Sequence, residues 1–369
     1  MDFKRTGALL GLATITTIGL AACSDNNAGG DDTAARAVSG AECGGKESLN
    51  ASGASSQNNA MTVFANSYAM SCDGHTLDYN SNGSGAGVKE FIGGQTDFGG
   101  SDSPLKDAEY AEAEVRCESP AWNLPAVFGP IAIAYNLDGV EVALSGETLA
   151  SIFKGDITNW NAPEIAAENE GVELPDQEIT VIFRSDESGT TDNFQKYLEA
   201  AGGDAWGLEA GKTFNGGVGE GAKGNEGVSA AVAQTPGTIT YTEWSYAKSQ
   251  NLSMVKVITP ADEAGVELNA ETAGTTIDSA KLKNSDSHDL VIDTSSFYVP
   301  ETAGAYPVIM PTYEIVCSKY PDAETAEAVK SFLNVAVAED VQGELEAEGY
   351  IPVPDAFRGK LLDAIDAIS

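Results

Sequence analysis

The stretch "ITVIFRSDESGTTDNFQKYLEAAG", residues 179–202, contains an apolar run, a polar turn and a helix-like segment in succession. The β-branched and aromatic residues at 179–184 predict a buried strand, and the periodic apolar residues after the turn predict an amphipathic helix that starts near Thr191. The turn combines Arg184 with small hydroxyl residues and a glycine. Because a helix N-terminus presents unpaired N–H groups, this turn is a candidate site for an anion.

The same alternation of short apolar runs and helix-like stretches continues from about Cys43 to the C-terminus, which is typical of an α/β protein. Three further polar turns stand where a predicted strand leads into a predicted helix: "SGASSQ" (52–57), "NGSGAG" (82–87) and "GGSDSP" (99–104). Serine and glycine also cap helices, so one such turn is weak evidence. Four of them indicate a ligand site, since ligands of open α/β sheets bind beyond the carboxyl ends of strands.

Other interpretations of these turns do not fit the residue spacing. "GSGAGVKEF" lacks the spacing of a dinucleotide-binding fingerprint, and no turn ends in the GK[ST] of a P-loop. "GGSDS" lacks the final glycine of a hydrolase nucleophile turn. The turns therefore favour binding over catalysis.

The composition limits the possible partners. The 369 residues include 56 acidic and 20 basic side chains, a net charge of −36, with 42% hydrophobic and 21% charged residues. This is the composition of a globular protein long enough for two domains. Its charge repels nucleic acid and anionic lipid headgroups, so neither is expected as a partner. An anion site in this chain has to act at short range, because salt screens long-range repulsion within about 10 Å.

The N-terminus predicts export. Lys4 and Arg5 precede an apolar run that is too short to span a bilayer, and "LAAC" ends at Cys23. We predict a lipoprotein signal peptide at 1–22, lipidation of Cys23, and a flexible tether at 23–42, where Asp, Asn, Gly and Ala predominate. The mature chain would then sit on the extracytoplasmic face of the cell membrane, held there by its lipid anchor only.

Four cysteines remain after Cys23, and an even number in an exported chain predicts two disulfides with three possible pairings. A strand at 47–52 followed by a returning helix at 57–70 would bring Cys43 and Cys72 to the same end, which leaves Cys117 with Cys317. The cysteines are scattered and the chain has two histidines, so we expect no metal site and no cofactor.

Taken together, the motifs "GASSQ", "YNSNGSGAGVKEF", "TDFGGSDSPL", "FRSDESGTTDNFQKYL", "GTITYTEW" and "YEIVCSKYPDA" resemble the phosphate-binding lipoproteins of the phosphate-specific ABC importer, the PstS family, above all its actinobacterial branch. The resemblance runs from about Cys43 to the C-terminus. It implies a type II periplasmic-binding-protein fold, in which two α/β lobes are joined by two crossover strands and the ligand lies in the cleft between them. Lobe I would comprise 43–129 and 305–369, and lobe II 130–304.

The resemblance also implies the ligand contacts, which are carried over motif by motif. Asp186 would support the guanidinium of Arg184, and Asp102 would face the ligand as an acceptor. The implied phosphate-binding residues are Ser55, Ser56, Ser84, Asp102, Arg184, Ser188, Gly189 and Thr190.

The function implied is capture of inorganic phosphate and its delivery to the permease subunits of an ABC importer, without enzymatic activity. A P–OH proton of phosphate would pair with Asp102, whereas sulfate carries no proton and would face it as a second acceptor. The alternatives are a binding protein for another tetrahedral oxyanion, a phosphatase on the same scaffold, and an adhesin or phosphate sensor that takes no part in transport.

Overall fold

Two long strands, β4 (Ala121–Tyr135) and β14 (Ile309–Cys317), form the centre of this computed structural model, which describes residues 35–369. They cover most of two apolar runs of the sequence, 128–137 and 306–317, and they pair antiparallel along the whole of β14. Nearly every residue of both strands is buried, as expected for strands covered on both faces. β4 begins seven residues earlier than the apolar run at 128–137.

The main sheet has nine strands in the order β2-β1-β3-β14-β4-β8-β6-β7, with β9 paired to β4. On one side of the central pair, β1 is parallel to β2 and β3. On the other side, β6 is parallel to β7 and β8. The other strands are β1 (Ser48–Gly53), β2 (Thr76–Ser81), β3 (Phe98–Ser101), β5 (Ala143–Ser145), β6 (Thr180–Arg184), β7 (Glu220–Ala222), β8 (Thr238–Glu243), β9 (Ser253–Met254), β10 (Lys256–Thr259), β11 (Asp262–Val266), β12 (Lys281–Leu282) and β13 (Ile292–Asp293).

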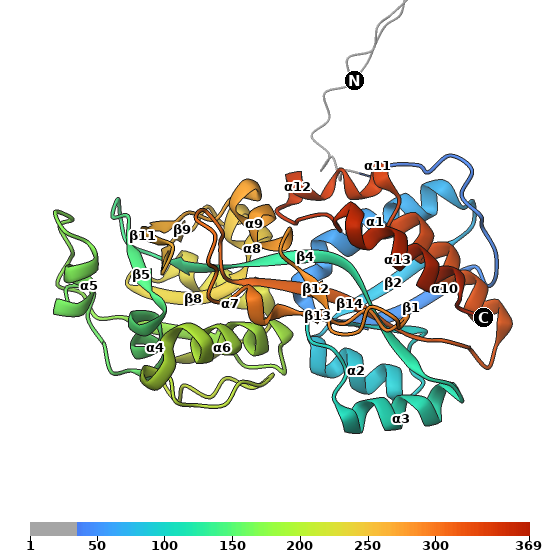
Figure 1. Ribbon diagram of the computed structural model, residues 1–369, viewed down its shortest axis with the longest axis horizontal. Helices are drawn as coiled ribbons and strands as arrows, with labels where there is room; N and C mark the ends of the chain where they lie inside the picture. The colour runs from blue at the N-terminus through green and yellow to red at the C-terminus, as the bar shows by residue number, and fades with distance from the viewer. Residues whose placement is uncertain (1–34) are drawn as a thin grey trace, which may run out of the picture. The chain divides into compact units, whose positions relative to one another are not determined.

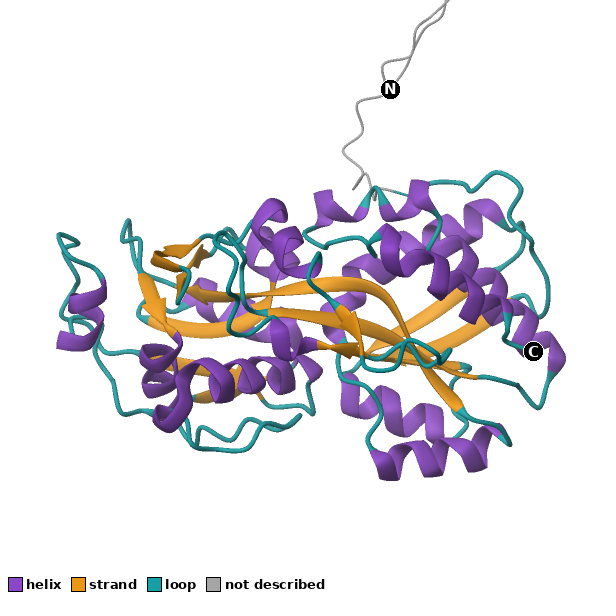
Figure 2. Ribbon diagram, in the orientation of Figure 1, coloured by secondary structure: helices purple, strands orange, loops and turns teal. Residues whose placement is uncertain are grey.

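Helices lie on both sides of the strands, as Figures 1 and 2 show. They are α1 (Asn58–Ser71), α2 (Ser84–Ile92), α3 (Asp107–Cys117), α4 (Gly146–Lys154), α5 (Pro163–Glu168), α6 (Gly189–Gly202), α7 (Gly224–Gln234), α8 (Trp244–Ser249), α9 (Ala270–Ile277), α10 (Ala323–Ala336), α11 (Glu339–Gln342), α12 (Leu345–Glu348) and α13 (Asp355–Asp366). A short 3-10 helix, η1 (Ser55–Gln57), links β1 to α1. The predicted α/β class is confirmed. Among the helices of residues 35–369, none is both long and apolar enough to cross a membrane.

The described residues form two large hydrophobic clusters, and the central strands contribute to both. Along β4 the side chains change cluster between Val127 and Phe128, and along β14 between Tyr313 and Ile315. The division into lobes at 129 and 304 remains a prediction.

Two disulfides fix distant parts of the chain. Cys43 is bonded to Cys72 and Cys117 to Cys317, which is the pairing favoured from the sequence. The second bond ties the end of α3 to the end of β14, across 200 residues of sequence.

The predicted tether at 23–42 is shorter than expected at its C-terminal end. The backbone N–H groups of Arg36 and Val38 donate to the hydroxyls of Ser67 and Ser71 on α1. The side chains of Val38 and Ala41 pack against the second core cluster. The chain is therefore attached to the domain from Arg36 onward. Cys23 and the predicted signal peptide lie outside the described residues.

Candidate anion-binding site

The four polar turns meet because the two groups of parallel strands end facing each other. Ser55 and Ser56 follow β1, and Ser84 opens α2 after β2. Asp102 follows β3 directly, while Arg184 is the last residue of β6. Hydrogen bonds described below join the two groups, so these residues form one connected cluster. All of the predicted phosphate-binding side chains are at most 2% exposed.

Ser84 connects three of the turns. Its hydroxyl oxygen accepts hydrogen bonds from the backbone N–H of Asp102 at 3.2 Å and from that of Gly189 at 3.1 Å. An oxygen that accepts two N–H groups still has its own hydrogen to donate. Ser84 is therefore a polarised O–H donor at the first residue of α2, where the helix N-terminus also favours negative charge.

Asp102 lies beside it and is the acceptor of the cluster. Ser56 Oγ donates to Asp102 Oδ1, and Thr190 Oγ1 donates to Asp102 Oδ2 at 3.2 Å. Burial raises the pKa of Asp102 to about 6, against the opposing effects of the Ser56 hydrogen bond, of Arg184 and of Thr190. Near neutral pH Asp102 is thus mostly ionised, and it can accept a hydrogen bond from a ligand that carries a proton.

Arg184 is held by Asp186 in a bidentate pair. Its Nε lies 2.8 Å from Oδ1 and its Nη2 lies 2.5 Å from Oδ2, and the arginine side chain is 1% exposed. Burial alone would raise the pKa of Asp186, but the hydrogen bonds and charge of Arg184, with the N–H of Gly224, lower it. The remaining nitrogen, Nη1, lies 3.5 Å from Thr190 Oγ1. The carboxylate fixes the guanidinium plane and leaves Nη1 directed into the cluster.

Ser188 and Gly189 belong to the start of α6, two residues before the start near Thr191 that the sequence predicted. Ser188 is the N-cap residue, and its Oγ accepts the N–H of Thr191 at 3.2 Å. Its own N–H donates to the carbonyl of Lys212. Because that N–H is already paired, the contribution of Ser188 to an anion would come from its O–H.

Sequence reasoning missed Asn225, which stands in the first turn of α7. Its backbone N–H and its Nδ2 both donate to Ser55 Oγ at 3.0 Å, and its Nδ2 also lies 3.5 Å from Thr190 Oγ1. Ser55 therefore resembles Ser84, an acceptor of two N–H groups with its own hydrogen left to donate. The signal available was "KGNEG" (223–227), a fifth glycine turn between a strand and a helix.

The two sides of the cluster are in close contact. A Cβ atom added to Gly189 would lie 2.6 Å from Asp102 Cβ and from Ser84 Oγ. Gly83 has a φ of 103°, and a Cβ there would lie 2.6 Å from Asp186 Oδ2. Glycine is required at both positions by this approach of backbone to side chain.

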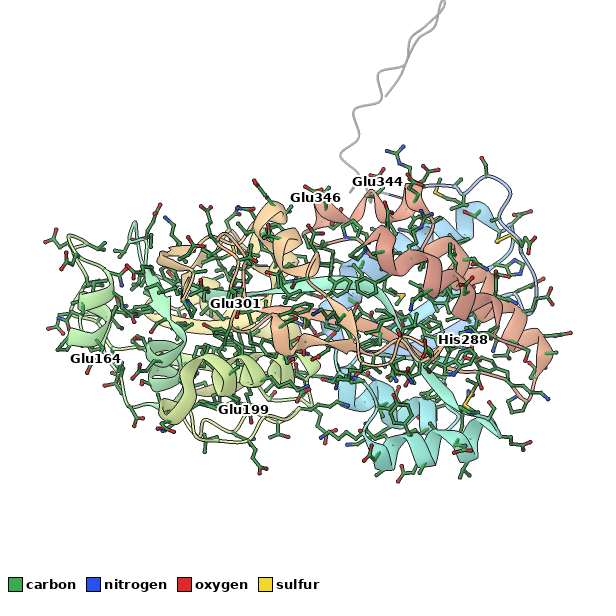
Figure 3. All side chains as sticks on the ribbon, viewed as in Figure 1. Glu164, Glu199, His288, Glu301, Glu344 and Glu346 are labelled. Atoms are coloured by element: carbon green, nitrogen blue, oxygen red, sulfur yellow. A yellow bond between two sulfur atoms is a disulfide. The ribbon has the colours of Figure 1, made fainter. Side chains whose placement is uncertain are left out.

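The charge of the surface does not extend into the cluster. Figure 3 shows acidic side chains such as Glu164, Glu199 and Glu301 on the outside of the fold. Within the cluster, the charge of Arg184 is balanced by Asp186, Asp102 is one further carboxylate, and the other groups are hydroxyls and N–H groups. Such dipoles act strongly at short range where water is excluded. The arrangement can hold a tetrahedral anion by several donors while presenting one carboxylate to it.

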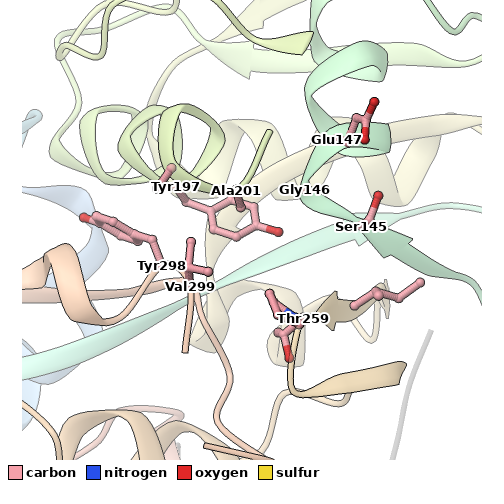
Figure 4. Close-up of a pocket in the computed structure, with 11 residues that line it drawn as sticks. Ser145, Gly146, Glu147, Tyr197, Ala201, Thr259, Tyr298 and Val299 are labelled. Atoms are coloured by element: carbon pink, nitrogen blue, oxygen red, sulfur yellow. The ribbon is translucent and has the colours of Figure 1, made fainter. Parts of the chain in front are cut away.

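A separate cavity of about 330 Å³ lies elsewhere in the fold. It is lined by residues of β5, α4, α6 and β10 and of the segment at 298–299, among them Ser145, Tyr197 and Thr259 (Figure 4). None of the predicted phosphate-binding residues lines it.

The cluster lacks the groups of a serine hydrolase or a metal centre. The two histidines of the chain, His75 and His288, lie against Tyr68 and Trp122 and not beside any of its serines. Within residues 35–369, no group of His, Cys, Asp and Glu could hold a metal ion.

Comparisons with known proteins identify the family of the chain. Residues 33–340 match the PBP superfamily domain. The chain is 52% identical to phosphate-binding protein PstS 3 and 50% identical to phosphate-binding protein PstS 2 of Mycobacterium tuberculosis, over 100% of both chains in each case.

Solved structures show the same fold. One is a putative phosphate ABC transporter substrate-binding protein with bound phosphate from Clostridium perfringens. It is 22% identical, with a TM-score of 0.60, covering 83% of this chain and 100% of that one. On these similarities, the chain belongs to the PBP superfamily and, within it, to the PstS family of phosphate-binding proteins.

Proposed function

We propose that this protein is an extracytoplasmic solute-binding protein that captures inorganic phosphate and delivers it to the permease subunits of an ABC importer. The observation that carries the proposal is the single hydrogen-bonded cluster of Ser84, Asp102, Arg184 and Thr190, built from turns that are far apart in sequence. The full proposed set of phosphate ligands is Ser55, Ser56, Ser84, Asp102, Arg184, Ser188, Gly189 and Thr190. The N–H of Gly189, which donates to Ser84 Oγ in this structure, would turn to the anion when it binds.

The donors account for affinity. Each charge-assisted hydrogen bond to a phosphate oxygen contributes on the order of 1.5–3 kcal/mol, so the hydroxyls, N–H groups and Arg184 together support micromolar or tighter binding after the cost of association. Asp102 accounts for selectivity, because it can accept a P–OH hydrogen while sulfate offers none. Another oxyanion without a proton is disfavoured for the same reason.

Binding rather than hydrolysis fits the chemistry of the cluster. Its hydroxyls are neighbours of amide, guanidinium and carboxylate groups, and neither histidine is near enough to activate one as a nucleophile. We propose further that lipidation of Cys23 holds the protein at the membrane. This anchoring raises the local concentration of phosphate-loaded protein beside the permease.

Calorimetric titration of the mature chain tests this function. We expect phosphate to bind with micromolar or lower dissociation constant, and sulfate to bind at least about a thousandfold more weakly. Equal affinities would contradict the proposal. Incubation with a generic phosphomonoester is the control for the enzymatic alternative, and steady release of phosphate would favour it. Phosphate uptake by a strain lacking the protein separates transport from sensing or adhesion.

A further inference from the structure

A buried glutamate lies behind the first turn of the site. Glu314 of β14 pairs in register with Gly100 of β3, and it is 0% exposed. Neither of its carboxylate oxygens has a hydrogen-bond partner among the described residues. An ionised carboxylate in such a place is costly, because burial removes its hydration and no hydrogen bond from the described residues replaces it.

The space beside Glu314 holds two polar side chains. A Cβ atom at Gly100 would overlap the amide of Gln57 and the hydroxyl of Tyr79. Residues opposite one another in an antiparallel pair point to the same face of the sheet, so Glu314 shares this face with Gln57 and Tyr79. Glycine at position 100 leaves room for this polar group inside the sheet.

Within the part of the chain that the structure describes, the hydrogen bonds of Gln57 and Tyr79 leave one side-chain oxygen without a donor. Gln57 Nε2 donates to the Tyr79 hydroxyl at 3.0 Å, and that hydroxyl donates to the carbonyl of Ala54 at 2.9 Å. Among the described residues, Gln57 Oε1 has no partner. A proton on Glu314 would supply the missing donor for Gln57 Oε1 and complete a chain from β14 to Ala54.

That chain ends beside the site. Ala54 directly precedes Ser55 and Ser56, whose hydroxyls belong to the hydrogen-bonded cluster. The backbone that positions these serines is therefore held by the Tyr79 hydroxyl, which in turn accepts a hydrogen bond from Gln57.

We propose that Glu314 is a positioning residue that carries a proton, that its O–H fixes the Ser55–Ser56 turn through Gln57 and Tyr79, and that loss of this proton weakens binding of the phosphate dianion. The proposal rests on the proposed function for its effect on phosphate, but the protonation itself does not. Deprotonation would leave an unpaired negative charge behind a site that already contains Asp102, and would remove the donor to Gln57.

The surroundings of Glu314 agree with a retained proton. Burial raises the pKa of Glu314 to about 8. The nearby Gln57 amide, which stabilises the ionised carboxylate, opposes this rise, although its Nε2 already donates to Tyr79. The charge of Asp102 adds to the rise. The titratable groups that act on it are Asp102 beyond β3 and Tyr79 on β2. Its neighbour on β4, Leu124, is apolar.

The test compares wild-type protein with Glu314→Gln and Glu314→Leu. The amide of glutamine can donate to Gln57 Oε1 without titrating, whereas leucine cannot donate. Phosphate dissociation constants are measured by calorimetry at about pH 8 and about pH 9.5, a range in which phosphate stays a dianion. We expect wild-type affinity to fall more than about tenfold over this range and that of Glu314→Gln to fall less than about threefold. Glu314→Leu should bind weakly at both pH values.

Equal pH slopes in wild type and Glu314→Gln would overturn the proposal, as would affinities of Glu314→Gln as low as those of Glu314→Leu. The side-chain carboxyl carbon of Glu314, assigned by NMR in wild-type protein, is the second measurement, and it requires neither a folded variant nor phosphate. Its chemical shift should change as pH rises through about 8. A shift typical of an ionised carboxylate at pH 6 would also overturn the proposal. Absence of phosphate binding by wild type at neutral pH would refute the proposed function alone.

Discussion

Replacing Asp102 with asparagine should remove most of the discrimination between phosphate and sulfate. The carboxylate is 2% exposed and accepts hydrogen bonds from Ser56 and Thr190. Asparagine keeps one acceptor oxygen for these hydroxyls and turns the other position into an N–H donor. This N–H can donate to an oxygen of either phosphate or sulfate, whether or not the anion carries a proton.

The size of the effect follows from the hydrogen bonds at this position. Phosphate gains a charge-assisted bond to Asp102 of about 1.5–3 kcal/mol, while sulfate leaves a buried acceptor unpaired at a cost of about 1–3 kcal/mol. The sum, about 4 kcal/mol, corresponds to roughly a thousandfold in affinity. In Asp102→Asn the ratio of the two affinities should fall below about tenfold, mainly because sulfate binds more tightly.

Acidification should have a related effect on the wild-type protein. Burial raises the pKa of Asp102 to about 6, so a proton is taken up as the pH falls through this value, and a neighbouring anion raises the pKa further. Protonated Asp102 is a donor. Sulfate should therefore bind wild type more tightly at about pH 5 than at about pH 7.5, and Asp102→Asn should show no such change.

Calorimetric titration of both proteins with both anions measures these quantities. Glu164→Gln is the matched control, because it makes the same change in net charge at an exposed position on α5. It should leave both affinities unchanged. A ratio in Asp102→Asn that stays near a thousand would refute the role of Asp102 in selectivity.

Four other changes have expected outcomes. Arg184→Lys loses the bidentate pair and should weaken phosphate binding by about a hundredfold in calorimetry, with an unchanged circular dichroism spectrum. Gly189→Ala places a methyl group 2.6 Å from atoms across the cluster, so it should weaken phosphate binding and expand the bound state in small-angle scattering. For Glu314, a folded-state pKa of about 8 against an ordinary 4.5 means that the folded state holds its proton more tightly. The free energy of unfolding of wild type should therefore fall between about pH 4.5 and pH 8, by about 5 kcal/mol at most, and Glu314→Gln should lack this loss in urea titrations. Removing the Cys117–Cys317 bond, which spans 200 residues, should lower stability by about 5 kcal/mol in thermal unfolding while phosphate affinity persists.

Much of the fold could be predicted because each element has its own local signal. Apolar runs between glycine-rich turns indicate the strands, and the periodic apolar residues after Arg184 indicate the helix that the structure shows as α6. The full length of β4 was not apparent, since Pro125 and Pro130 are unfavourable for strands. β14 runs beside them as the paired strand, and its register with β4 shifts at Thr312.

From the sequence alone, the less periodic region from Thr259 to Ser296 would be assigned to the periphery of a domain. Leu290 instead packs in the second core cluster, and Asp289 accepts hydrogen bonds from Asn123 and Tyr110. These contacts span more than 160 residues of sequence, so no local pattern could indicate them.

The candidate site, like the fold, could be predicted only in part from the sequence. The turns that carry Ser84, Asp102 and Arg184 could be found, because each has a strand end and a helix start on either side. Glu314 could not, since one acid within "PTYEIVC" has the pattern of a strand side chain facing solvent. Only the pairing of β14 with β3 shows that this side chain points into the protein.

A chain with a net charge of −36 can hold an anion because its charges and its donors are separated in space. The acidic side chains are spread over the surface, where salt screens them. In the cluster, Asp186 balances Arg184, and the hydroxyls of Ser55 and Ser84 are oriented by the N–H groups that they accept. A proton on Glu314 would keep a further negative charge out of the same region. Binding then depends on oriented dipoles and on the placement of a few protons, and the total charge of the chain has little influence on it.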